Sequence, residues 1–205
     1  MNPSATDRRA IRREMRRARR ALSAPERRRR SEALARQLFR HPLFRNADRI
    51  GVYLANDGEV DLDPLLQRAR ACHKHCFLPV IGGPGVRRMR FAAYHPDSVL
   101  KRNAYGIPEP DARHAVPPWG LDLLLMPLVA FDRRGGRLGM GGGFYDRSLD
   151  YRAHRRVWTP PKLVGTAFDF QEHPALPLAP WDVPLEAVAT DADIIPVRET
   201  ATPAA

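Results

Sequence analysis

Hydrophobic positions near the start of the chain recur at helical spacing. Four apolar residues are separated by four, three and four positions, namely Ile11, Met15, Ala18 and Leu22. This spacing places all four on one face of a helix. Arginines occupy most of the positions between them. The pattern therefore predicts a helix with one apolar face and strongly basic remaining faces.

A second helix is expected directly after the first. Ser23 and Glu26 form the S-x-x-E pair of a capping box, which typically starts a helix. The helical pattern continues through Ala33, Leu34, Gln37 and Leu38. The pair His41-Pro42 predicts the end of this helix, because the residue before a proline disfavours helical backbone angles.

Short apolar runs and helical segments alternate along the rest of the chain. The runs expected to be strands are 50–54, 76–81, 89–94, 121–129, 163–168, 187–190 and 194–197. The segments expected to be helices are 62–71 and 144–154, with a turn at 56–58. Run 121–129 is the most hydrophobic, and its length is typical of a central strand that is buried on both faces.

This alternation predicts an α/β fold with three layers, in which a mostly parallel sheet is flanked by helices. A basic helical segment at residues 1–40 precedes the sheet. We expect residues 1–205 to form a single domain, with a flexible tail at 199–205.

The composition is that of a folded globular chain. The 205 residues are 43% hydrophobic, which suffices for one domain with a sizeable core. No apolar run reaches the roughly 18 residues that a membrane-spanning helix needs. The start of the chain lacks the apolar segment of a secretory signal, and two cysteines are too few for a disulfide framework. We therefore expect a cytoplasmic protein that does not enter the membrane, and we expect a monomer.

The net charge of +11 is concentrated at one end of the chain. Residues 1–40 contain 14 Arg against 4 Asp or Glu, a balance of +10, so the remaining residues contribute +1. A basic segment on a nearly neutral domain follows, rather than a surface that is basic throughout. An RNA-binding protein that uses this segment stays an alternative, although the chain has no RNA-binding motif.

The glycine-rich segment from Arg137 to Asp146 is the strongest candidate for chemistry. It follows the most hydrophobic run and leads into a predicted helix. The N-terminus of a helix offers unpaired backbone N–H groups, and glycines let a phosphate approach that backbone closely. Arg137 and Arg147 can add charge-assisted hydrogen bonds to phosphate oxygens, and Asp146 can hold a bridging Mg²⁺.

Two widespread phosphate-binding motifs do not match this segment. No Lys-Ser or Lys-Thr pair follows the glycines, as a P-loop requires. The dinucleotide fingerprint needs a small residue at position 144, which is Phe144. The residues alone indicate either an anion-binding loop or a tight glycine turn that packs a helix on a sheet. Another phosphate-binding enzyme on a similar scaffold, such as a sugar-phosphate isomerase, also stays an alternative.

This stretch closely resembles the signature of 5-formyltetrahydrofolate cyclo-ligases, which are also called methenyltetrahydrofolate synthetases. The residues of the signature are Met126-Pro127, Ala130-Phe131-Asp132 and the run from Gly136 to Arg147. The resemblance extends over nearly the whole chain, and its other segments are 59–61, 78–79, 103–110 and 181–186. It implies an enzyme that uses ATP and Mg²⁺ to convert 5-formyltetrahydrofolate, with or without additional glutamates, to 5,10-methenyltetrahydrofolate.

The resemblance also implies which residues bind ATP. They are Arg8, Arg12, Arg137, Leu138, Gly139, Met140, Gly141, Gly142, Gly143, Phe144 and Tyr145. Two of these, Arg137 and Tyr145, would act directly in catalysis. The family often has Lys at the position of Arg8, and the neighbouring Arg9 can serve in its place.

By the same resemblance, the folate would be bound by Leu54, Glu59, Tyr105, Phe144 and Tyr145. Asp146 and Asp182 would hold Mg²⁺. Other interpretations stay open from the residues alone. Glu59 beside a turn can be a solvated side chain, Asp182 can be a turn or cap residue, and Tyr105 can belong to the core.

Overall fold

The computed structural model describes residues 5–81, 88–104, 106–154, 160–177, 179 and 181–197. Its α-helices are α1 (Ala5–Ala21), α2 (Ala24–Arg40), α3 (Pro42–Arg45), α4 (Asp63–Ala71) and α5 (Phe144–Leu149). Its strands are β1 (Arg49–Gly51), β2 (His75–Ile81), β3 (Met89–Ala93), β4 (Lys101–Arg102), β5 (Pro108–Glu109), β6 (Leu123–Pro127), β7 (Ala130–Phe131), β8 (Arg137–Leu138), β9 (Lys162–Thr166), β10 (Ala187–Ala189) and β11 (Ile194–Pro196). The expected tail at 199–205 lies outside the described residues.

Seven strands of the described part form one mixed sheet in the order β11-β10-β9-β6-β1-β2-β3. The five inner strands are parallel to one another, and the two edge strands β3 and β11 are antiparallel to their neighbours. Strand β6 lies in the middle of the sheet, and four of its five residues are buried. The structure thus confirms a mostly parallel sheet with the most hydrophobic run at its centre.

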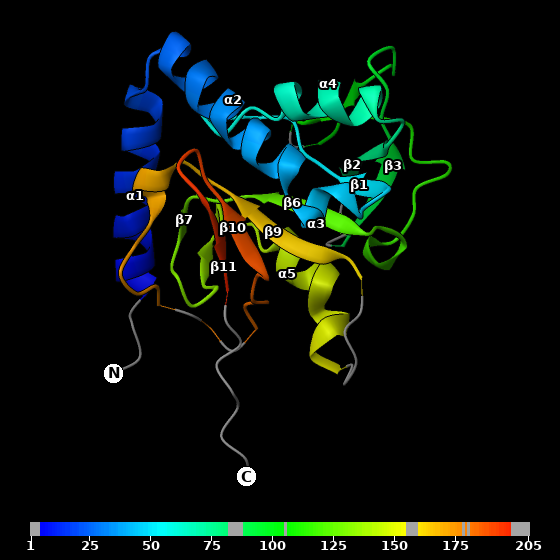
Figure 1. Cartoon of the computed structure of the whole chain (residues 1–205). Helices are drawn as coiled ribbons and strands as arrows, with labels where there is room; N and C mark the ends of the chain where they lie inside the picture. Colours follow the sequence, from blue (N-terminus) through cyan, green and yellow to red (C-terminus); the bar gives the residue numbers. More distant parts are fainter. Residues whose placement is uncertain are drawn as a thin grey trace.

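Helices cover both faces of this sheet (Figure 1). Leu123 and Leu125 of β6 belong to a core cluster shared with α2, α3 and α4. Leu124 and Met126 belong to a second cluster that includes Leu149 of α5. Because successive side chains of a strand point to opposite faces, these two clusters form the two sides of a three-layer α/β fold, as predicted.

The local signals of the second helix are also confirmed. Ser23 is the N-cap of α2, and its hydroxyl accepts a hydrogen bond from the backbone N–H of Glu26 at 3.3 Å. His41 ends the helix, as the following proline predicted. The expected helix at 144–154 is only partly helical, because α5 passes into a 3-10 turn from Asp150 to His154.

The predicted inner face of α1 is wrong at one position. Ile11 is buried and Met15 packs beside it, but Ala18 is exposed. Arg19 is fully buried instead. In Figure 1, α1 lies along the edge of the domain beside β7. The C-terminal half of α1 packs against the polar turn at Asp57 rather than against an apolar core. The side chain of Arg19 points into the protein there and donates to the carbonyl oxygen of Asp57.

Two small hairpins supplement the main sheet. Strands β7 and β8 pair antiparallel and deliver the chain to the glycine segment. The buried carboxylate of Asp132 caps their turn by accepting hydrogen bonds from the N–H groups of Arg134 and Gly136, at 3.0 and 2.9 Å. Strands β4 and β5 form the second hairpin. No helix in the described ranges is long and apolar enough to cross a bilayer.

Candidate active site

A cavity of about 710 Å³ opens between α1, the glycine segment and the ends of several strands. Tyr53 and Leu54, which follow β1, line it together with Pro127 and Leu128 at the end of β6. These neighbouring strands are parallel, so their carboxyl ends open on the same edge of the sheet. Ligands of open α/β sheets generally bind at this edge.

The structure brings most of the predicted site residues to this cavity. Those that line it are Arg8, Arg12, Leu54, Glu59, Arg137, Gly139, Met140, Gly141, Gly142, Gly143, Phe144, Tyr145, Asp146 and Asp182. They come from α1, from the loops after β1 and β8, from α5 and from the segment before β10. The tertiary fold therefore gathers groups that are as far as 174 positions apart in the sequence.

The glycine segment approaches the cavity as bare backbone. Gly141 and Gly143 have φ values of +103° and +63°, which side chains rarely adopt. A Cβ atom at Gly143 would also lie 2.6 Å from Nη1 of Arg147. At Gly141 and Gly143 the segment between β8 and α5 thus presents backbone to the cavity in conformations that would strain a residue with a side chain.

Three arginines surround this backbone. Arg12 donates from Nε to the carbonyl oxygen of Gly139 at 2.8 Å. Arg8 pairs with Asp182 at 2.8 Å, and Arg137 pairs with Asp146. Burial lowers the pKa of the Arg137 guanidinium. Its Nε is buried and has no hydrogen-bond partner within the described residues. A buried donor of this kind on a cavity wall is suited to an anionic ligand.

Two carboxylates, Asp146 and Asp182, lie near the same guanidinium. Asp146 pairs with Arg137, Asp182 pairs with Arg8, and the charges of both carboxylates raise the pKa of Arg137 against the effect of its burial. Carboxylate oxygens are ligands that Mg²⁺ prefers, and one or two protein carboxylates usually suffice when phosphates complete the shell. The described residues contain no group of three or more His, Cys, Asp or Glu side chains that would form a protein-only metal site.

Glu59 is buried, which excludes the alternative of a solvated side chain. Only 9% of the residue is exposed. Its Oε2 accepts a hydrogen bond from the backbone N–H of Asn56 at 3.1 Å, and its Oε1 lies 3.9 Å from Nη1 of Arg19. Burial raises the pKa of the Glu59 carboxyl, and the Asn56 N–H and Arg19 lower it. A carboxylate in such a position can bind N–H groups of a ligand.

Tyr145 and Phe144 line the cavity from the start of α5. Burial raises the pKa of the Tyr145 hydroxyl, and the negative charge of Glu59 raises it further. Tyr145 is therefore protonated at neutral pH and can donate a hydrogen bond. The guanidinium of Arg147 lies over the ring of Phe144, 5.2 Å from the ring centre.

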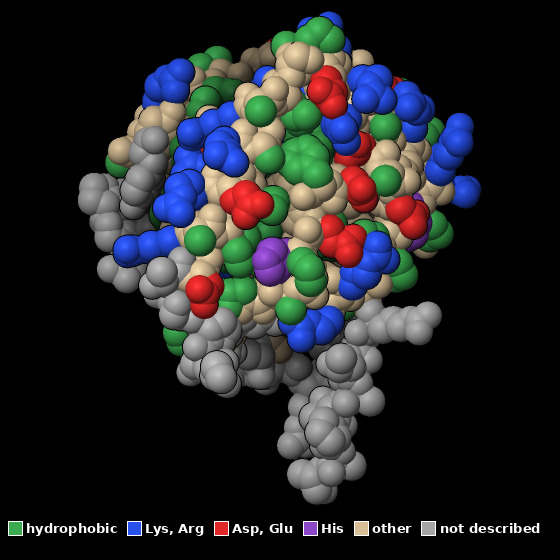
Figure 2. Space-filling model, turned by 90° about the vertical axis from the view of Figure 1, so that its left-hand side faces the viewer, with side chains coloured by type: hydrophobic (Ala, Val, Ile, Leu, Met, Phe, Trp, Pro, Cys, Tyr) green, Lys and Arg blue, Asp and Glu red, His purple; other side chains and the backbone are tan. Residues whose placement is uncertain are grey.

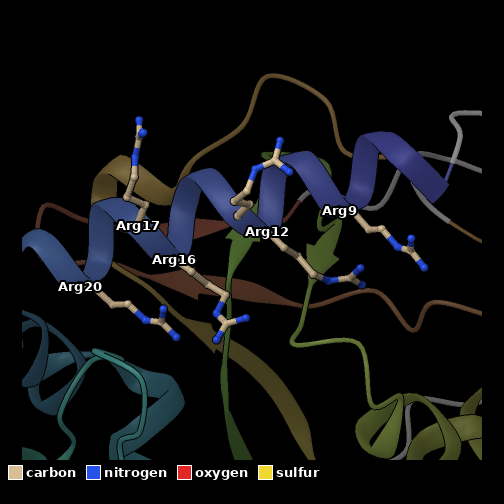
Figure 3. Close-up of a pocket in the computed structure, with 6 residues that line it drawn as sticks. Arg9, Arg12, Arg16, Arg17 and Arg20 are labelled. Carbon is tan, nitrogen blue, oxygen red and sulfur yellow. The ribbon is translucent and has the colours of Figure 1, made fainter.

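Three predicted positions stand apart from this arrangement. Leu138 is buried in a small core cluster beneath α1 and does not line the cavity, so its side chain is not available to a ligand. Tyr105 lies outside the described residues. Arg9 lines a separate groove along α1, in which Figure 3 shows Arg9, Arg16 and Arg20 on the same side of the helix. Of the pair Arg8 and Arg9, it is Arg8 that reaches the cavity.

The surface beside α1 is not uniformly basic. Figure 2 shows Lys and Arg side chains on this face with Asp and Glu side chains between them. Asp57 alone pairs with Arg16, Arg19 and Arg20. Three arginines of α1 are therefore held by contacts within the protein, and the face carries charges of both signs, which gives no support to a uniformly basic nucleic-acid surface.

Sequence reasoning missed several residues of the cavity. Trp181 and Ile107 line it and are exposed large apolar side chains, 71% and 41% accessible. Glu109 lines it as well, and one of its oxygens accepts from the backbone N–H of Ile81 at 2.8 Å. These residues lie in stretches that resemble the family, but their spacing carries no signal of a shared pocket.

Comparison with known proteins identifies the family. The model of the 5-formyltetrahydrofolate cyclo-ligase family matches residues 4–191. The 5-formyltetrahydrofolate cyclo-ligase of Escherichia coli K12 is 40% identical over 182 residues, covering 88% of this chain and 98% of the relative. That of Haemophilus influenzae is 37% identical, covering 87% and 94%.

A solved structure agrees with these relatives. The 5,10-methenyltetrahydrofolate synthetase of Aquifex aeolicus superposes with a TM-score of 0.79 and 32% identity, covering 97% of this chain and 96% of that one. The fold, the ordered matches along the chain and the glycine segment beside its arginines all agree, and this chain belongs to the 5-formyltetrahydrofolate cyclo-ligase family.

Proposed function

We propose that this protein converts 5-formyltetrahydrofolate to 5,10-methenyltetrahydrofolate with hydrolysis of ATP to ADP and phosphate. Membership of the cyclo-ligase family supports the reaction. The observation in the structure that supports it best is the cavity itself. The glycine segment with its three arginines and the buried carboxylate of Glu59 line the same cavity of about 710 Å³. The cavity therefore offers one subsite for an anion and a second subsite for N–H groups of a ligand.

The nucleotide subsite would be the glycine segment 139–143 with Arg8, Arg12 and Arg137. Backbone N–H groups and guanidinium groups together neutralise phosphate charge. Nε of both Arg8 and Arg137 is buried without a partner among the described residues, and Arg137 is the more deeply buried of the two. Arg137 therefore has the most to contribute. It would stabilise the charge on the phosphoryl group during transfer, which is the main task of protein side chains in such reactions.

The chemistry explains why ATP is needed. The formyl oxygen is amide-like and leaves poorly, whereas phosphate leaves well. The formyl oxygen attacks the terminal phosphorus and ADP departs. N10 of the folate then attacks the formyl carbon and gives up its proton to solvent, the C–O bond breaks, and phosphate leaves as the methenyl bridge forms. Tyr145 would donate a hydrogen bond to the reacting oxygen, and the cavity would hold N10 and the formyl carbon close together.

Mg²⁺ would be held by Asp146 and Asp182, and it would supply charge neutralisation between the phosphates. Both side chains line the cavity, and each is already paired with an arginine of the nucleotide subsite. These pairs hold the two carboxylates on the side of the cavity where phosphates would lie. The residues present therefore fit a metal ion that is shared with ATP.

The folate subsite would be formed by Glu59 with Leu54, Phe144, Tyr145 and Tyr105. An ionised Glu59 can accept two parallel N–H bonds from the pterin ring, and the neighbouring apolar side chains would pack against that ring. We further propose that the enzyme is monomeric and cytoplasmic and that it accepts polyglutamylated folate.

The first test is direct. Purified protein is mixed with 5-formyltetrahydrofolate, ATP and Mg²⁺, and the near-ultraviolet absorbance of the methenyl product is followed, with ATP omitted in the control. Growth that depends on ATP supports the proposal. A folded protein without such growth would contradict it.

A further inference from the structure

Arg19 stands out because it is fully buried and yet does not line the cavity. We propose that Arg19 is a positioning residue that fixes the carboxylate of Glu59, so that folate binding depends on the packing of α1 against the turn before Glu59. This inference rests on the proposed role of Glu59 in the folate subsite. It assigns a function to one arginine of the basic segment 1–40, whose arginines cannot be distinguished by their sequence pattern.

Each nitrogen of the Arg19 side chain has a partner. Nε donates to the carbonyl oxygen of Asp57 at 3.1 Å, and Nη2 donates to its Oδ2 at 3.0 Å. Nη1 donates to the carbonyl oxygen of Leu128 at 3.1 Å and lies 3.9 Å from Oε1 of Glu59. The planar guanidinium thereby contacts the turn, the end of β6 and the carboxylate at the same time.

The turn held in this way determines where Glu59 points. Asp57 and Gly58 have φ values of +51° and +75°, and a Cβ atom on Gly58 would lie 3.2 Å from the carbonyl oxygen of Arg19. The turn therefore lies directly against α1. Asn56 donates to the side chain of Glu59 and accepts from its backbone N–H at 3.0 Å. Fixing the turn thus fixes the carboxylate.

Helix α1 also reaches the other subsite. Arg12 donates to the backbone of Gly139, and Arg8 pairs with Asp182. Arg8 and Arg19 are eleven positions apart, which corresponds to about 16 Å along a helix. One helix therefore contacts both the nucleotide and the folate sides of the cavity.

Charges around Glu59 make Arg19 testable by pH. Arg19 reaches it from α1 and lowers its pKa, whereas Asp57 in the turn raises it. The other titratable groups facing it are Tyr53 after β1 and Tyr145 in α5, and both stay neutral because burial and Glu59 raise their pKa. Arg19 therefore favours the ionised form of Glu59 that a ligand N–H needs.

The experiment compares Arg19→Met with the unchanged protein in steady-state assays. We expect KM for 5-formyltetrahydrofolate to rise about tenfold or more, since a hydrogen-bonded charge next to the ligand-binding carboxylate is lost. KM for ATP should stay within about twofold, because the nucleotide contacts belong to other arginines. The acid limb of kcat/KM for the folate should move to higher pH.

Two further variants distinguish a loss of Glu59 positioning from general damage to the fold. Asp57→Asn removes the charge that raises the pKa of Glu59, so its acid limb should move to lower pH, opposite to Arg19→Met. Arg19→Lys keeps a positive charge and should restore the acid limb while recovering KM only in part, because one ammonium cannot replace the three-way contact. Both variants also decide the matter if Arg19→Met does not fold.

Arg20→Met is the matched control. Arg20 pairs with the same Asp57 carboxylate but is 58% exposed and does not reach Glu59. Its kinetics should stay within about twofold of the unchanged protein. The inference is overturned if Arg19→Met keeps the folate KM and the acid limb, or if it alters both KM values equally. No ATP-dependent turnover in the unchanged protein would instead overturn the proposed function.

Discussion

The two sides of the cavity are built in different ways. The glycine side is nearly continuous in sequence, since β8, the glycine loop and α5 follow one another from Arg137 to Leu149. The Glu59 side is assembled from α1, the turn after β1 and the end of β6, so Arg19 and Leu128 meet across 109 positions. The first side is shaped by backbone conformation, and the second by buried charge.

The comparison shows what each subsite tolerates. A bare backbone loop needs glycine conformations, so it depends on a few local positions. A buried carboxylate needs its charge compensated, and each partner comes from a different element. Changes in the glycine side should therefore act on ATP use and turnover, whereas changes around Glu59 should act on folate binding, pH dependence and stability.

The largest effect is expected at Arg137 on the glycine side. Arg137→Met removes the buried guanidinium that would neutralise the transferring phosphoryl group, and we expect kcat to fall about 100-fold or more. Single-turnover measurement of methenyl product would show it. Arg134→Met is the control, because Arg134 lies in the same hairpin, is exposed and pairs with Asp132 outside the cavity. Equal losses in the two variants would contradict the role of Arg137.

A smaller but specific effect is expected at Asp146. Asp146→Ala should raise the Mg²⁺ concentration needed for half-maximal turnover by about tenfold or more, since one of two carboxylate ligands is lost. Mg²⁺ titration at saturating ATP measures it. Asp150→Ala serves as the control, because Asp150 follows α5 and pairs with Arg88 at the surface. Unchanged Mg²⁺ dependence in Asp146→Ala would reject the metal role.

On the other side of the cavity, Glu59→Gln should raise KM for the folate by about tenfold, because a neutral amide replaces a charged acceptor. KM for ATP should change little. This split tests the division of the cavity into two subsites. Equal loss of both ligands would show that Glu59 is structural.

Glu59→Gln should weaken folate binding, but it should leave the stability of the fold unchanged or increase it. Burial raises the pKa of Glu59 above its value in the unfolded chain, so the folded state resists losing this proton. Stability is then lost as pH rises from the pKa of this carboxyl in the unfolded chain through its higher pKa in the folded protein. Glu59→Gln lacks this loss, and its Tm at pH 7 should equal or exceed that of the unchanged protein. A Tm of Glu59→Gln at pH 7 that lies below the Tm of the unchanged protein would contradict this.

The smallest effect is expected from backbone strain. Gly143→Ala forces a side chain into a left-handed conformation, which should destabilise the protein by about 1 kcal/mol. Gly139→Ala is the control for stability, because a Cβ there meets nothing within 4 Å and no positive φ is required. Thermal unfolding of the pair would show whether the loop conformation or its composition matters.

Much of the fold was predictable because its signals are local. The capping serine, the proline that ends α2 and the hydrophobic run that becomes β6 each act within a few residues. The glycine segment was predictable for the same reason. Its resemblance to the family then assigned residues such as Glu59 and Asp182, whose own surroundings in the sequence indicate no site.

The sequence by itself therefore determined the α/β class, the family and the residues of the glycine loop. Only the tertiary structure decided that Arg19 rather than Ala18 turns inward, that Leu138 belongs to the core, and that Glu59 is buried. The physical reason is that burial and charge pairing depend on neighbours brought together across the chain. Fourteen arginines in the first 40 residues have the same chemistry in the sequence, and packing against Asp57 and Leu128 makes Arg19 different.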